Sequence, residues 1–151
     1  MKDIPENGTI AVPNDATNES RALYLLESAG LIKLDVKGKE LATVANIKEN
    51  KKNLTISELD ASQTPASLTS ADAAVVNNTF VREAGIDYKK ALFKEEANEN
   101  SKQWYNLIAA KPDWKKSDKA DAIEKIIKAY HTDEVKKVIE ESSDGMDQPV
   151  W

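Results

Sequence analysis

The sequence predicts an α/β fold with a largely parallel sheet, and three observations lead to that prediction. Short apolar runs alternate along the chain with longer segments in which apolar residues recur every three or four positions. Hydrophobic residues make up 40% of the 151 residues, which is enough to bury a core. No internal repeat or low-complexity tract interrupts the alternation. We therefore expect one ordinary domain or two small lobes.

The first strand and the first helix are expected near the N-terminus. Residues 9–12 form a short apolar run that ends at Pro13, which cannot donate to a sheet ladder. Thr17 or Asn18 can cap the helix that follows, and Gly30 can close it. The apolar face of this helix is predicted to consist of Ala22, Leu25, Leu26 and Ala29, at i, i+3, i+4 and i+7.

The next elements are shorter and less regular. In order, we expect a weak helical segment at 41–49, a strand around 54–59, a turn with a short helical piece at 63–70, a buried strand at 73–76 and helical turns at 79–84 that stop at Gly85.

The second half of the chain is expected to hold two strands and two helices. The strands are predicted at 91–93 and 105–110, one helix from Ser117, and a last helix with Val135, Val138 and Ile139 on its apolar face. Residues 95–102 are the most linker-like part, so we predict a lobe boundary near 92–103.

Composition excludes several classes of protein and site. The net charge is −5, and no basic stripe is interleaved with aromatic residues, so nucleic-acid binding is not expected. Cysteine is absent, which excludes disulfides, thiol nucleophiles, thiolate metal sites and a lipid-modified cysteine within these residues. No apolar run approaches the roughly 18 residues of a membrane span.

Catalytic and metal-binding patterns are also weak. His131 is the only histidine, and no G-x-S-x-G elbow accompanies it. One histidine without cysteines is a poor basis for a zinc site, and five scattered glycines form no phosphate loop. We therefore predict that the chain is not an enzyme and holds no metal or cofactor.

Polar residues at two strand ends suggest a ligand site instead. Asn14 follows the first predicted strand, and Asn77 follows the strand at 73–76. If the two strands are parallel in one sheet, both asparagines lie at the same crevice, where α/β sheets bind ligands. Arg21, near the start of the first helix, could grip a carboxylate there. The alternative is that Arg21 is solvated or pairs with Glu19 or another acid, and that the asparagines only shape turns.

Several stretches, in order along nearly the whole chain, resemble the NlpA-type methionine-binding lipoproteins of bacterial ABC importers. They are IAVPNDATNESRALYLLESAGLIKL, LATVANIKENKKNLTISELDASQTPASL, ADAAVVNNTFVREAGID, ALFKEE and WYNLIAAKPD. The resemblance implies a type II periplasmic-binding-protein-like α/β fold. It also implies that residues 1–92 form the second, ligand-facing lobe. Residues 93–151 would be a crossover strand and C-terminal helices of the first lobe, and the N-terminal half of the fold would be missing.

The same resemblance implies roles for individual residues. Arg21 would contact the α-carboxylate of the substrate, and Asn77 the backbone of the amino acid. Asn18 and Asn14 lie in a matched segment and are further candidates. Phe80 stands where the family typically has a tyrosine, which argues against a role for a hydroxyl group at this position.

The expected function is therefore that of a substrate-binding component of an ABC amino-acid importer, binding L-methionine between two lobes. An ABC permease would be its partner, and the complete protein would be lipid-anchored at the cell surface or in the periplasm. The alternative is a folded fragment without ligand binding of its own, acting as a structural or surface-antigen domain. Apolar faces in 103–151 would lack their natural cover, so a homodimer through the C-terminal segments is expected.

Overall fold

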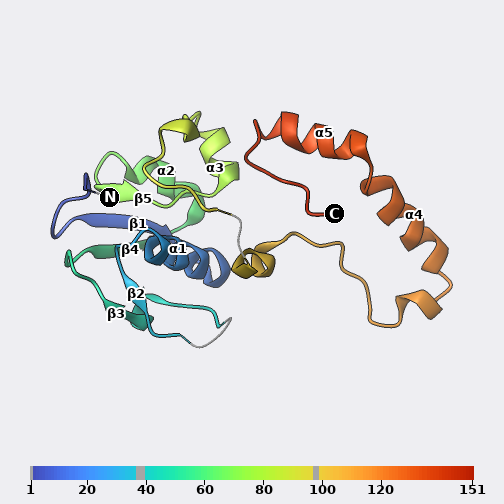
Figure 1. Cartoon of the computed structure of the whole chain (residues 1–151), viewed down its shortest axis with the longest axis horizontal. Helices are drawn as coiled ribbons and strands as arrows, with labels where there is room; N and C mark the ends of the chain where they lie inside the picture. The colour runs from blue at the N-terminus through green and yellow to red at the C-terminus, as the bar shows by residue number, and fades with distance from the viewer. Residues whose placement is uncertain (1, 37–39, 97–98) are drawn as a thin grey trace. The chain divides into compact units, whose positions relative to one another are not determined.

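The computed structural model describes residues 2–36, 40–96 and 99–151. The chain divides into two compact units, residues 1–104 and 105–151 (Figure 1).

Unit 1 is built on a three-stranded parallel sheet in the order β4-β1-β5. Its strands are β1 (Thr9–Pro13), β4 (Thr55–Leu59) and β5 (Ala73–Ala74). Ile10 of the central strand is opposite Ile56 on one side and Ala73 on the other. Four of the five β1 residues are buried, as expected for a strand covered on both faces. The predicted parallel sheet is confirmed, although β5 is shorter than the predicted 73–76.

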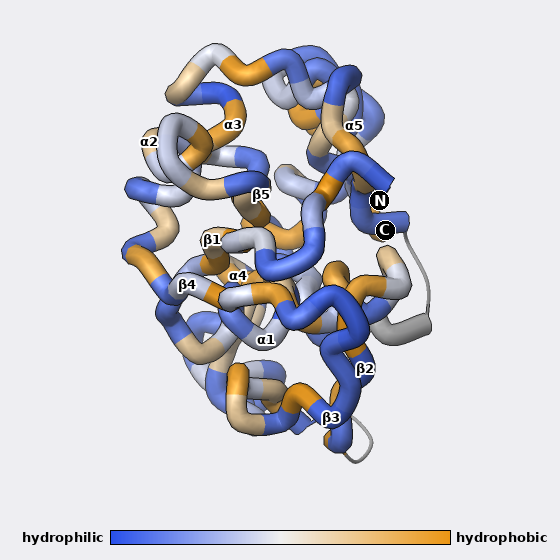
Figure 2. Tube along the Cα trace, turned by 90° about the vertical axis from the view of Figure 1, so that its left-hand side faces the viewer, coloured by the Kyte–Doolittle hydropathy of each residue, from blue (hydrophilic) through white to orange (hydrophobic). Residues whose placement is uncertain are grey.

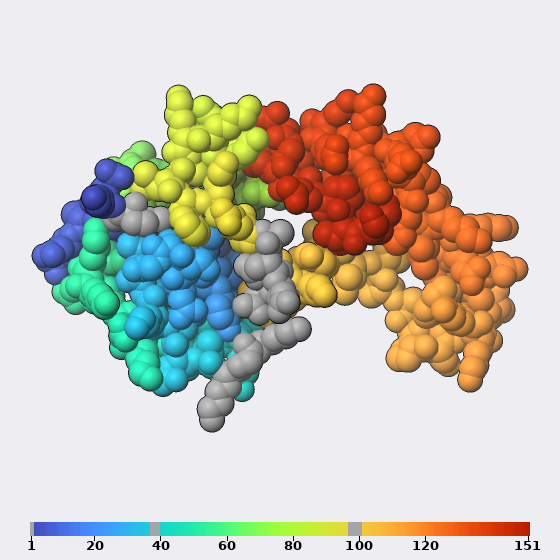
Figure 3. Space-filling view, viewed as in Figure 1, coloured from blue at the N-terminus to red at the C-terminus, as the bar shows by residue number. Residues whose placement is uncertain are grey.

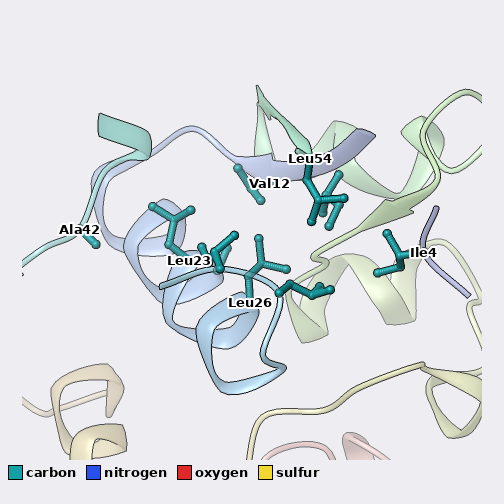
Figure 4. Close-up of a cluster of buried hydrophobic side chains, with 10 residues drawn as sticks. Ile4, Val12, Leu23, Leu26, Ala42 and Leu54 are labelled. Atoms are coloured by element: carbon teal, nitrogen blue, oxygen red, sulfur yellow. The ribbon is translucent and has the colours of Figure 1, made fainter. Parts of the chain in front are cut away.

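Helix α1 (Ala16–Ser28) packs against β1, and its Ala22, Leu23 and Leu26 are part of the core. Gly30 follows the helix with φ of 73°, a left-handed conformation that glycine adopts without strain. The buried cluster consists of Ile4, Ile10, Val12, Ala22, Leu23, Leu26, Leu31, Ile32, Ala42 and Leu54 (Figure 4).

The N-cap of α1 differs from the predicted one. Asp15, not Thr17 or Asn18, is the N-cap, and its carboxylate accepts a hydrogen bond from the Asn18 backbone N–H at 3.1 Å. Aspartate is a favourable cap because it satisfies a free N–H and also interacts with the positive end of the helix dipole.

This cap leads to a stability prediction. Asp15→Ala should lower the free energy of unfolding by about 1 kcal/mol, because the Asn18 backbone N–H loses its acceptor and is left unpaired. Urea denaturation followed by circular dichroism measures the change. Thr17→Ala is the matched control, since Thr17 is exposed and makes no cap hydrogen bond. Equal losses for the two variants would contradict the assignment of Asp15 as the cap.

The prediction of a helix at 41–49 is wrong. The segment forms a short 3₁₀ helix, η1 (Val44–Asn46), and strand β3 (Ile47–Glu49), which pairs antiparallel with β2 (Lys33–Leu34). Tertiary contacts explain the difference. The Ala42 N–H donates to Ser20 Oγ at 2.9 Å, and the Val44 N–H to Glu19 Oε1 at 3.1 Å. Two side chains of α1 thus anchor the backbone at residues 42 and 44, and pairing with β2 keeps residues 47–49 extended.

An ion pair joins the two strands of this small second sheet. Lys33 Nζ lies 3.0 Å from Glu49 Oε1. The hydrogen bond from Lys33 holds the pKa of the Glu49 carboxyl below its ordinary value.

Short helical pieces complete unit 1. Helix α3 (Asn78–Glu83) confirms the predicted turns before Gly85, and α2 (Thr64–Ser67) confirms the helical piece after residue 63. The predicted strand at 91–93 is wrong, because this segment is irregular and the Leu92 side chain is exposed. The pieces are η2 (Ala61–Gln63), α2 (Thr64–Ser67), α3 (Asn78–Glu83), η3 (Tyr88–Lys90) and η4 (Glu99–Trp104).

Unit 2, drawn from orange to red in Figure 3, contains η5 (Trp114–Lys116), α4 (Ala120–Tyr130) and α5 (Asp133–Ser142). Both long helices were predicted, but α4 begins three residues after Ser117. Thr132 caps α5 by accepting a hydrogen bond from the Val135 N–H at 3.2 Å. The predicted strand at 105–110 is wrong: the segment is irregular, because it pairs with no strand among the described residues.

The described part of unit 2 has no hydrophobic core of its own. Its only buried side chain is Ser143, whereas the core lies entirely in unit 1. Hydrophobic and hydrophilic residues follow one another closely along α5 (Figure 2). The exposed large apolar side chains of the unit are Leu107, Ile108, Ile126, Tyr130, Val138 and Val150. Tyr130 contacts the Trp151 ring, with centroids 5.4 Å apart, and all of these side chains stay largely exposed.

Candidate ligand-binding site after strands β1 and β5

The carboxyl ends of β1 and β5 lie side by side, because the two strands are parallel neighbours in the sheet. The residues that follow them therefore meet at one edge. Asp15 and α1 come after β1, and Asn77 comes after β5. This is the edge at which open α/β sheets hold ligands.

The side chains of Asp15, Asn18 and Asn77 form a chain of hydrogen bonds at this edge. Asp15 accepts two hydrogen bonds from Asn18 Nδ2, at 3.2 and 2.9 Å. The amide of Asn18 is thereby oriented, and its Oδ1 accepts a hydrogen bond from Asn77 Nδ2 at 3.0 Å. The structure thus brings Asn18 and Asn77 into contact although they are 59 positions apart.

Asn77 presents an unsatisfied acceptor. It is the N-cap residue of α3, yet its side chain makes no cap hydrogen bond and reaches Asn18 instead. Its Oδ1 is buried and has no hydrogen-bond partner within the described part of the chain. Leaving a buried acceptor unpaired is unfavourable, so the oxygen is suited to a donor such as an ammonium group.

Arg21 lies on the same face of α1 as Asn18, three residues further on. It is the sixth residue of the helix, beyond the first turn in which the dipole disfavours a cation most. Its Nε and Nη2 lie 2.8 and 2.7 Å from Glu95 Oε2. Of the pairings expected for Arg21, the structure therefore shows one with another acid and not with Glu19, whose Oε1 accepts the Val44 N–H.

Asn14, the fourth candidate, is not part of this arrangement. Its side chain is exposed and makes no hydrogen bond in the portion of the chain that the structure describes. The sequence pattern assigns no role to Glu95. No local pattern could have found Glu95, because it is 74 positions from Arg21 in an irregular segment. Asp15 was identifiable, since an aspartate three residues before Asn18 is a common cap.

Other kinds of site are not observed in the described residues. No group of three or more histidine, aspartate or glutamate side chains is close enough to hold a metal ion there. The helices among these residues are all too short or too polar to cross a bilayer.

Comparison with known proteins identifies the family. The model of the NlpA lipoprotein family matches residues 1–151. The chain belongs to this family. The D-methionine-binding lipoprotein MetQ of Escherichia coli K12 is 38% identical over 138 residues, which are 89% of this chain and 49% of the relative. Outer membrane lipoprotein 1 of Mannheimia haemolytica is 39% identical over 135 residues, 89% of this chain and 47% of the relative. The chain thus spans about half the length of the curated relatives it matches.

Solved structures of the family share the fold. The substrate-binding protein of a methionine transporter from Streptococcus pneumoniae is 78% identical, with a TM-score of 0.87 over 100% of this chain and 58% of that one. A nutrient-binding protein from Burkholderia cenocepacia, solved with bound methionine, is 36% identical, with a TM-score of 0.71 over 96% of this chain and 59% of that one. The NlpA-family chain therefore has the α/β fold of periplasmic substrate-binding proteins and matches about 60% of their length.

Proposed function

We propose that the protein is the substrate-binding component of an ABC importer and that it binds L-methionine between two lobes. The observation that carries the proposal is the pairing of Asn77 with Asn18, one helical turn from Arg21. Arg21 and Asn18 share one face of α1, and Asn18 is bonded to Asn77, whose amide oxygen has no partner among the described residues. A zwitterionic amino acid needs both, a donor for its carboxylate and an acceptor for its ammonium group.

The individual roles follow from this chemistry. Arg21 grips the α-carboxylate, Asn77 accepts from the α-ammonium group, and Asn18 orients Asn77. We assign no ligand contact to Asn14, because its side chain takes no part in the hydrogen bonds that link Asp15, Asn18 and Asn77. The relatives support methionine as the substrate, since the Escherichia coli protein is named as D-methionine-binding and the Burkholderia protein was solved with methionine. An ABC permease is the proposed partner, and the proposed location is the cell surface or periplasm, with a lipid anchor.

Calorimetric titration with L-methionine tests the proposal. The complete natural protein that carries these 151 residues should bind L-methionine. Residues 1–151 alone should bind it weakly or not at all, because one lobe supplies only part of a binding site that lies between two lobes. Absence of binding by the complete protein would contradict the proposal. It would favour the alternative, a structural or surface-antigen role without a ligand.

We also propose how the chain is divided in the complete protein. Residues 1–92 form the ligand-facing lobe, and 93–151 cross to the other lobe and complete it. The sheet and the buried core lie within 1–81, which supports a self-contained first part. The uncovered apolar faces of α4 and α5 support the second part, because they need a partner that unit 2 lacks.

The same faces lead to a prediction for residues 1–151 in isolation. Ile126 and Val138 are 58% and 61% exposed, and such faces favour association. We expect a homodimer in size-exclusion chromatography with light scattering. Replacing both residues with glutamine should shift the chain to monomer, while Val44→Gln, outside these faces, should not. A wild-type monomer at high concentration would contradict the prediction.

A further inference from the structure

We propose that Glu95 is a positioning residue for the ligand carboxylate, holding one edge of the Arg21 guanidinium and leaving another edge for the ligand. This inference rests on the proposed role of Arg21. It adds a residue from a distant part of the chain, to which neither the sequence pattern nor the family comparison assigned a function.

The geometry of the ion pair defines which edge is taken. A guanidinium carries five N–H donors in a rigid planar fork. Nε and Nη2 of Arg21 both point to one oxygen, Glu95 Oε2, at 2.8 and 2.7 Å. Glu95 therefore occupies the edge formed by Nε and Nη2. The edge formed by Nη1 and Nη2 has no acceptor among the described residues, and it matches the two oxygens of a carboxylate.

Glu95 supplies an orientation that α1 does not provide. The side chain of Arg21 is 39% exposed, and long cationic side chains lose much rotational freedom when fixed. The nearest acid on the helix, Glu19, is buried and committed to the Val44 N–H. The Glu95 carboxylate, 32% exposed, is thus the group that fixes the guanidinium plane before ligand arrives. Fixing it in advance reduces the ordering cost of binding.

The same contact argues against simple competition between Glu95 and the ligand. A carboxylate that replaced the ligand on the open edge would place its oxygens on Nη1 and Nη2. Here a single oxygen takes both hydrogen bonds, and Oε1 takes none from Arg21. The ligand carboxylate can therefore bind without displacing Glu95.

Calorimetry on the complete natural protein tests the inference with two ligands, L-methionine and L-methioninamide, which lacks the carboxylate. Glu95→Gln should weaken methionine binding about fivefold, the upper range for a partly exposed ion pair. It should leave methioninamide binding unchanged. In an Arg21→Ala background, Glu95→Gln should have no further effect, because the two residues act as one unit. Glu83→Gln, an exposed charge at the end of α3, is the matched control.

The outcomes separate this inference from the proposed function. If Arg21→Ala weakens methionine binding but Glu95→Gln leaves it unchanged or tightens it, the inference is overturned and the proposed function stands. Equal losses for methionine and methioninamide also overturn it. If Arg21→Ala itself has no effect, the proposed role of Arg21 fails.

A measurement without ligand tests the positioning directly. In NMR spectra of the unliganded protein, the Arg21 Nε–H should exchange slowly with water and should become fast-exchanging in Glu95→Gln. Slow exchange that persists in the variant would overturn the inference whichever ligand the protein binds.

Discussion

Arg21→Ala should weaken binding of L-methionine to the complete natural protein by at least about thirtyfold, which corresponds to about 2 kcal/mol. The reason is that the ligand carboxylate leaves water on binding and then lacks its charged partner. Asn77 and Asn18 cannot replace it, since their amides are already bonded to each other and to Asp15. Calorimetric titration of the purified variant measures the loss.

The matched control for this prediction is Arg82→Ala, which removes the other arginine of the chain from α3. It changes the net charge equally and should leave the affinity unaltered. Unchanged affinity in Arg21→Ala would show that Arg21 serves only its ion pair with Glu95. Comparable losses for both arginines would indicate a general effect of charge on the ligand.

Leu23→Ala should lower the free energy of unfolding by about 2–5 kcal/mol, the largest stability effect we expect from a single substitution. Leu23 is fully buried in the cluster between α1 and β1, so truncation leaves a cavity that its neighbours fill only partly (Figure 4). Urea denaturation followed by circular dichroism measures the loss for unit 1.

Leu107→Ala is the control for this prediction, because it makes the same chemical change where the side chain is 81% exposed. Its effect should stay within about 0.5 kcal/mol. If the two variants lost equal stability, the core would not be centred on α1 and β1.

Predictions from the sequence were reliable where local chemistry decides the structure. Helix α1 ends as expected because Gly30 readily takes a positive φ, and β1 is central because its apolar run suits burial on both faces. They failed where a distant partner is required. Residues 41–49 have a helical pattern, but Ser20 and Glu19 hold their backbone in another conformation. The apolar segment at 105–110 forms no strand, because hydrophobic sequence cannot supply a neighbouring ladder.

The family resemblance adds Asn18 as a candidate. From local pattern, the sequence predicts the α/β class, the two strand ends that carry polar residues, and the candidates Arg21, Asn14 and Asn77. These depend on periodicity, capping and strand ends, which act over a few neighbouring residues. The arrangement of these side chains is seen only in the folded chain. The hydrogen bond between Asn18 and Asn77 and the ion pair between Arg21 and Glu95 join residues 59 and 74 positions apart. Such contacts arise from the order of the strands in the sheet and the path of the chain, which no local pattern encodes.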